Sequence, residues 1–137
     1  MMAGGCDSND WRRLVVAAIG SVLALSAPVA AHACGACAED KIAATYDHAV
    51  VTRAAADGDL MVYCEVVGHF DRRRLLQAAG RVHAIRADSV RISAQPAAFS
   101  FAVDRSRQSP RSAVEATQRG LRAGTRLTII DSVKAPD

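Results

Sequence analysis

The sequence predicts one small α+β domain behind an apolar leader. Two observations predict the domain: the order strand, helix, strand, strand, helix, strand over residues 60–133, and the apolar character of the first and third of those strands. The chain has 137 residues, and the 104 that follow position 33 are enough for one hydrophobic core but not for two. We therefore expect a signal peptide at 1–33, a helical lead-in at 34–59 and the domain at 60–133.

The leader has the layout of a cleaved secretory signal. An arginine pair precedes an apolar run at residues 14–25, and small residues, Ala31 and Ala33, mark two candidate cleavage points. The run is shorter than the roughly 20 apolar residues that a membrane span needs. We expect a periplasmic or secreted protein with no stable membrane span after cleavage. Cleavage after Ala33 would place Cys34 first, as in a lipoprotein, and cleavage after Ala31 would leave His32 on the exported chain.

The lead-in predicts a helix over residues 38–56. Ile42, Tyr46 and Val50 recur at a helical spacing, and the acidic pair at 39–40 suits the positive end of the helix dipole. The turn signal at 57–59 ends this helix. A short strand at 50–52 is the alternative.

The first strand and helix of the domain are predicted at 60–67 and 71–80. The strand is apolar on both faces, as in the centre of a sheet, with Cys64 on the face that we expect beneath the helices. Asp71 is a typical N-cap, and Leu75, Leu76 and Ala79 form the predicted buried side of the helix.

The second half of the domain repeats this pattern. Residues 88–94 alternate as an edge strand does, residues 97–103 form a second nearly apolar strand, and a turn joins them. A proline after Ser109 predicts a helix that runs to Gly124. The last strand is predicted at 125–133. Its buried face is predicted to carry Leu127, Ile129 and Val133.

This order is that of the ferredoxin-like split βαβ arrangement, in which the first and third strands are central and two helices cover one face of the sheet. Over residues 60–133 the chain resembles the heavy-metal-associated domain family of small copper and mercury carriers. The resemblance lies in the element order, in Gly68 after the first strand and in the Ser109-Pro110 helix start. The family's Gly-Met-x-Cys-x-x-Cys metal loop falls at 68–74, where both thiols are missing. The resemblance therefore implies the fold and transfers no ligand to this loop.

A different thiol pair, Cys34 and Cys37, is the candidate metal site. The two residues begin the predicted lead-in helix, where unpaired backbone amides and the helix dipole favour thiolates. Two thiolates at this spacing can hold Cu(I) or supply half of a four-ligand Zn(II) site. They can equally form a structural disulfide or one that exchanges with partners. Haem attachment is excluded because Ala38 follows the second cysteine.

Three further features have competing interpretations. Cys64 is read as a buried small hydrophobe, with a third sulfur ligand as the alternative. His69 is read as a solvated loop residue, with a degenerate metal site as the alternative. The arginine run at 72–74 is read as a solvated face, with an acidic partner surface as the alternative.

Composition and motifs argue against two classes of function, nucleic-acid binding and catalysis. The net charge of +3 is mild and aromatic residues are few, so nucleic-acid binding has little support. The sequence shows no nucleophile triad, catalytic carboxylate pair or phosphate-binding glycine loop, and we expect no enzymatic activity. We expect an exported protein that binds or hands on a soft metal ion through Cys34 and Cys37. The alternatives are a cofactor-free disulfide-bonded interaction module with an unknown protein partner, and a weak thiol-exchange protein.

Overall fold

The computed structural model describes residues 37–134 and is an α+β structure with one four-stranded antiparallel sheet, which confirms the expected class. The predicted signal at 1–33 and Cys34 lie outside the described residues. No helix in the described part is long and apolar enough to cross a membrane. The elements, in chain order, are α2 (Ala38–Thr45), α3 (His48–Asp57), β1 (Leu60–Val67), α4 (Arg72–Gly80), the 3-10 turn η2 (Ala87–Ser89), β2 (Arg91–Ala94), β3 (Ala97–Val103), α5 (Pro110–Arg119) and β4 (Arg126–Lys134).

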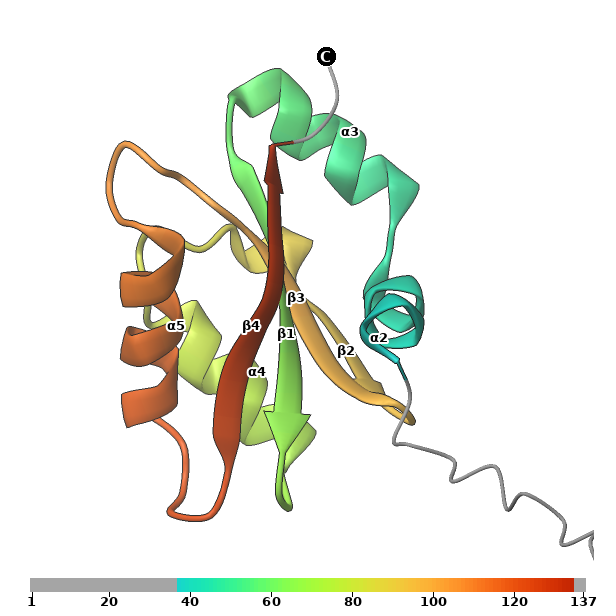
Figure 1. Ribbon diagram of the computed structural model, residues 1–137. Coiled ribbons are helices and arrows are strands. Elements are labelled where there is room, and N and C mark those ends of the chain that lie inside the picture. Colours follow the sequence, from blue (N-terminus) through green and yellow to red (C-terminus); the bar gives the residue numbers. More distant parts are fainter. Residues whose placement is uncertain (1–36, 135–137) are drawn as a thin grey trace, which may run out of the picture. The chain divides into compact units, whose positions relative to one another are not determined.

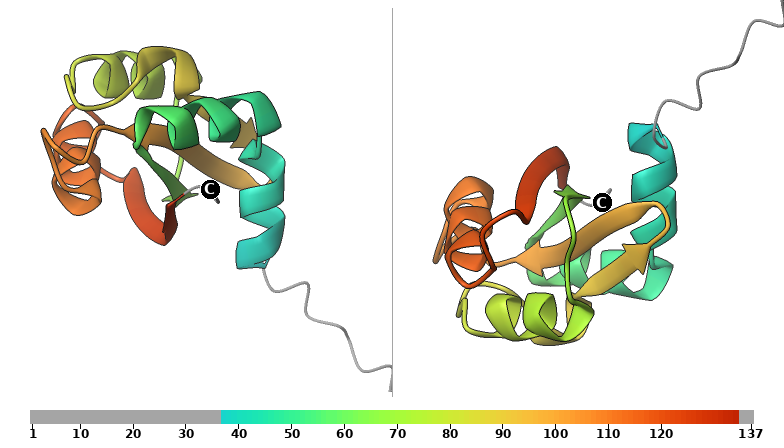
Figure 2. Two further views of the ribbon diagram at one scale, coloured as in Figure 1. Left: turned by 90° about the horizontal axis from the view of Figure 1, so that it is seen from above. Right: turned by 90° about the horizontal axis from the view of Figure 1, so that it is seen from below.

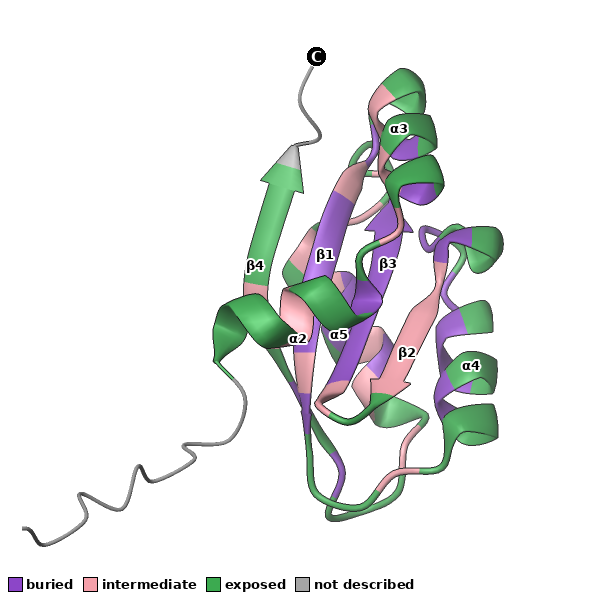
Figure 3. Cartoon of the chain, turned by 90° about the vertical axis from the view of Figure 1, so that its right-hand side faces the viewer, coloured by how far each residue is buried: buried purple, intermediate pink, exposed green. Residues whose placement is uncertain are grey.

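The strands lie in the order β2-β3-β1-β4, and each neighbouring pair is antiparallel. The two inner strands are β1 and β3, which the sequence predicts from their apolar character. Figure 3 shows these two strands buried along most of their length, whereas β2 is half-buried and the visible length of β4 is largely exposed. The two most apolar of the four described strands therefore occupy the middle of the sheet.

Helices α4 and α5 cover one face of the sheet (Figure 1). Cys64 and its neighbours on alternate positions of β1 point to this face, because successive side chains of a strand point to opposite sides. The main core lies here. Its central members are Val62, Cys64, Val66, Leu75, Ala79, Phe99, Phe101, Val103, Ala113 and Val114.

Helices α2 and α3 lie against the other face, where a smaller core forms around Met61 and Tyr63 of β1. Val50 and Ala54 of α3 and Ala102 of β3 complete it. In Figure 2, α2 lies beside the hairpin that joins β2 to β3. Helices α2 and α3 therefore pack on the sheet together with the predicted domain at 60–133.

The helix predicted at 38–56 is two helices, because the chain turns at Tyr46 and Asp47. Tyr46 has an extended backbone (φ −70°, ψ 129°), which ends α2. The Asp47 side chain accepts hydrogen bonds from the backbone N–H groups of Ala49 and Val50, at 3.0 and 3.2 Å, and so starts α3. The sequence pattern missed this break because the apolar spacing continues through the cap residue. The alternative of a strand at 50–52 is wrong, since these residues lie in α3.

Three predicted details of the domain are wrong. The helix α5 ends with its C-cap at Gly120 and not at Gly124, which instead lies in the following turn with φ +94°. The edge strand β2 starts at Arg91, because the preceding residues form η2. In α4, Leu76 is 42% exposed and Ala78 is buried in its place.

The predicted face of the last strand is correct for Leu127 and Ile129 and wrong for Val133. The pairing of β4 with β1 shifts between Tyr63 and Cys64, so that Cys64 pairs with Ile129 whereas Tyr63 pairs with Asp131. One extra residue, Ile130, fits between these pairs. A bulge of this kind reverses the side-chain alternation beyond it, so Val133 lies on the face of α2 and α3.

Candidate functional site

Cys37 is the one member of the predicted thiol pair that the structure describes. It is a free, exposed cysteine directly before α2. Its backbone N–H donates a hydrogen bond to Oδ2 of Asp40 at 3.2 Å, and Glu39 lies in the same first turn. The thiol is therefore accessible and has two acidic residues beside it in the chain.

The sheet holds α2 at two points. Lys41 forms an ion pair with Glu65 of β1, and the carbonyl oxygen of Thr45 accepts a hydrogen bond of 3.0 Å from Oγ of Ser100 in β3. The Ser100 hydroxyl is fully buried, so the contact at the C-terminal end of α2 is shielded from water. Cys37 therefore stands at the exposed end of an anchored helix.

Cys64 lies on the other side of the sheet from α2. It is 1% exposed and belongs to the core under α4 and α5, which confirms the expectation that it serves as a small buried hydrophobe. Burial raises the pKa of its thiol to about 12. Because the sheet separates it from the helix that Cys37 precedes, Cys64 cannot join Cys37 in one metal site or disulfide without unfolding of the core.

We expect the two described thiols to differ sharply in reactivity. Iodoacetamide added to the native, reduced protein should alkylate Cys37 and leave Cys64 untouched, since alkylation requires an accessible thiolate. Peptide mapping by mass spectrometry identifies the modified residue. Guanidinium chloride should then make Cys64 react, and a Cys64→Ala variant should lack that second labelling event. Rapid labelling of Cys64 in the native state would contradict the burial described here.

The three histidines in the described part of the chain lie in separate places. His48 begins α3, whereas His69 and His83 lie in the loops before and after α4, and all three are exposed. Within residues 37–134, no three His, Cys, Asp or Glu side chains gather as metal ligands. His69 contributes a backbone contact, since its carbonyl oxygen accepts a hydrogen bond of 2.7 Å from the Thr125 hydroxyl.

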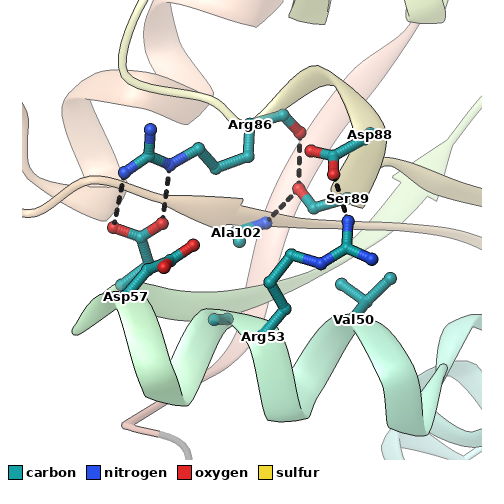
Figure 4. A pocket seen from close by; sticks show the side chains of 9 residues that line it. Val50, Arg53, Asp57, Arg86, Asp88, Ser89 and Ala102 are labelled. Carbon is teal, nitrogen blue, oxygen red and sulfur yellow. Dashed lines mark hydrogen bonds and ion pairs between the residues drawn. The ribbon is translucent and has the colours of Figure 1, made fainter.

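A polar cavity of about 220 Å³ lies between α3 and η2 and was not predicted from the sequence. Asp59, buried at 3% exposure, accepts hydrogen bonds from Nε and Nη2 of Arg86 at 2.7 and 3.5 Å. Figure 4 shows Arg86 reaching toward the end of α3, while Arg53 extends from α3 to pair with Asp88. The charged groups pair with one another across the cavity. These ion pairs join α3 and the residues after it to the segment before β2.

The sequence gives little indication of the Asp59–Arg86 ion pair. Asp59 follows a glycine with φ +72°, and the Asp-Gly-Asp sequence there reads as an ordinary turn. Only the fold brings Arg86 from 27 residues away to the buried carboxylate.

An apolar groove of about 270 Å³ opens between α2, α3 and the end of β4. It is lined by Ile42, Tyr46, Val51, Met61, Tyr63, Asp131 and Val133. Burial, together with the nearby Tyr46 and Asp131, raises the pKa of Tyr63 above its ordinary value. Its hydroxyl therefore ionises at a higher pH than that of a free tyrosine.

Comparison with family models, with curated proteins and with solved structures finds no match for this chain.

Proposed function

We propose that this chain is an exported, non-enzymatic protein that binds or hands on a soft metal ion through Cys34 and Cys37. The observation that carries the proposal is the free, exposed thiol of Cys37 at the start of an anchored helix. A rigid support for one sulfur reduces the conformational entropy that is lost when a pair of thiolates closes on an ion.

The surroundings of Cys37 favour a cation. Glu39 and Asp40 place negative charge in the first turn of α2, and this charge attracts a metal ion and disfavours anionic reactants. Cu(I) accepts two thiolates, whereas structural Zn(II) takes four ligands. Since Cys64 lies on the far side of the sheet, we favour Cu(I) over Zn(II).

We assign the domain to the ferredoxin-like fold, as in the heavy-metal-associated family that it resembles. The strand order β2-β3-β1-β4, with α4 and α5 on one face, supports the assignment. In that family the thiols follow the first strand, where this chain has the sequence at 68–74. The proposal moves the metal site to the start of α2.

The proposal predicts one bound Cu(I) per reduced protein. We expect Cys37→Ser and Cys34→Ser each to abolish binding in a titration against a chromogenic Cu(I) chelator, because each variant removes one of two ligands. Cys64→Ala is the matched control and should keep full stoichiometry. Equal Cu(I) binding by Cys37→Ser and the unaltered protein would contradict the proposal. Mass spectrometry of the exported form tests the leader and shows whether Cys34 is lipidated or disulfide-bonded.

The apolar groove supports an interaction module as the second candidate. Tyr46 and Val133, at its rim, are 53% and 41% exposed, and exposed apolar surface of this kind often contacts a protein partner. If the exported protein carries a permanent Cys34–Cys37 disulfide and takes up no Cu(I), this candidate replaces the metal-binding one. A disulfide with a reduction potential in the range of exchange proteins would instead favour thiol exchange.

A further inference from the structure

Six exposed arginines gather at the end of the molecule where β1 ends and β4 begins. In Figure 1 this is the lower end, where α4 starts and α5 finishes. Three of the arginines open α4, and three lie at or after the end of α5. We call this surface the basic end, and it consists of Arg72, Arg73, Arg74, Arg119, Arg122 and Arg126.

Two hollows connect the two groups of arginines through Arg74 and Arg122. Arg74 and Arg122 line a hollow of about 120 Å³ together with His69 and Phe70. Arg122 also lines a wider groove of about 820 Å³, which it shares with Arg119 and Arg126. The arginine run of α4 is therefore not an isolated solvated face, because the fold places Arg122 in the same hollow as Arg74, the last arginine of the run.

The arginines of the basic end have no acidic partners within the described part of the chain. Arg53, Arg86, Arg91 and Arg107 all form ion pairs, whereas none of the six does so among residues 37–134. Asp71 is the one acid that lines either hollow, and it accepts a hydrogen bond from the backbone N–H of Arg74 as the α4 cap. Cations at a helix N-terminus also disfavour the helix. Among residues 37–134, most of the positive charge of the basic end is therefore left unbalanced by acidic side chains.

The backbone under the basic end is fixed. The Thr125 hydroxyl donates to the His69 carbonyl oxygen and so joins the two loops. The Gln118 side chain accepts from the N–H of Leu127 and donates to the carbonyl oxygen of Thr125, at 2.7 and 2.6 Å, which holds the start of β4 against α5. The arginines thus project from a rigid support, and less entropy is lost when they bind a ligand.

We propose that the basic end docks an extended, acidic segment of a partner protein. Arginine forms bidentate hydrogen bonds with carboxylates, and six unpaired guanidinium groups offer a row of such sites. The hollows suit a chain that lies in a groove better than the flat surface of a bilayer. A single-stranded nucleic acid would need several aromatic stacking platforms, and Phe70, half-buried against the core, is the one aromatic residue that lines either hollow.

The test measures the binding of a fluorescent peptide of alternating glutamate and serine by anisotropy. The double variant Arg74→Gln/Arg122→Gln removes two charges from the basic end. The control, Arg105→Gln/Arg111→Gln, removes the same charge from exposed arginines in the loop after β3 and at the start of α5. We expect the first variant to weaken peptide binding about tenfold and the control less than about twofold. Binding should also fall as salt is raised from 20 to 300 mM.

Circular dichroism should show that both variants stay folded, because all four side chains are exposed. The same measurements with vesicles rich in phosphatidylglycerol and with single-stranded DNA distinguish the alternatives. Equal losses in the two variants would overturn the proposal, as would absence of peptide binding by the unaltered protein or tighter binding to vesicles or DNA. Since the variants leave Cys34 and Cys37 unchanged, these results do not depend on the proposed metal site.

Discussion

Replacement of Phe99 by alanine is expected to lower the free energy of unfolding by about 3–5 kcal/mol. Phe99 is fully buried in β3, beneath α4 and α5, and its ring centroid lies 5.1 Å from that of Phe101. Removal of the ring leaves a cavity between the sheet and both helices, which cannot close without moving an inner strand. Small domains are stable by only about 5–15 kcal/mol, so the loss is a large part of the total. Urea unfolding followed by far-ultraviolet circular dichroism measures it.

Val133→Ala is the matched control for a large-to-small change in the sheet. Val133 lies on an edge strand and is 41% exposed, so its replacement should change the unfolding free energy by less than about 0.5 kcal/mol. If the two variants had the same unfolding midpoint, the main core would not lie on the face of α4 and α5.

Gly68→Ala is expected to disrupt the basic end of the molecule. Gly68 has φ +89°, a conformation that costs L-residues about 1–2 kcal/mol. An added Cβ would also overlap the carbonyl oxygen of Gly124, so one of the two loops would have to move. We expect a lower unfolding midpoint and faster amide hydrogen exchange in the loops that join β1 to α4 and α5 to β4.

Gly58→Ala separates backbone strain from this overlap. Gly58 has φ +72°, but an added Cβ would meet nothing within 4 Å. The variant should therefore carry the conformational cost alone, about 1 kcal/mol, and leave the basic end unchanged. Equal effects of the two substitutions would show that the contact between the loops contributes nothing.

The pattern of apolar residues in the sequence predicts the strands well, because burial on both faces leaves a continuous apolar run. Both inner strands, β1 and β3, have the predicted bounds. The helix ends are less well predicted, since they depend on short-range caps. Asp47 interrupts an unbroken apolar spacing, and Gly120 ends α5 four residues before Gly124, where the pattern predicts the end.

Contacts between distant segments could not be predicted from local patterns. The sequence indicates a thiol motif at 34–37 and a buried Cys64, but it does not show that the sheet lies between Cys64 and the helix that Cys37 precedes. The bulge that turns Val133 to the other face leaves no mark on the alternation of β4. The gathering of arginines around Arg122 likewise requires the folded positions of two loops.

The layer of α2 and α3 has a consequence for fragments of this protein. A peptide that begins at residue 60 would keep every strand but lose the cover over Met61, Tyr63 and Ala102. Its uncovered sheet face would expose apolar side chains to water, and we expect such a fragment to aggregate. Helices α2 and α3 are therefore a structural part of the domain and cannot be removed without loss of stability. Transfer of Cys37 and its helix to another protein would also require transfer of the sheet that supports them.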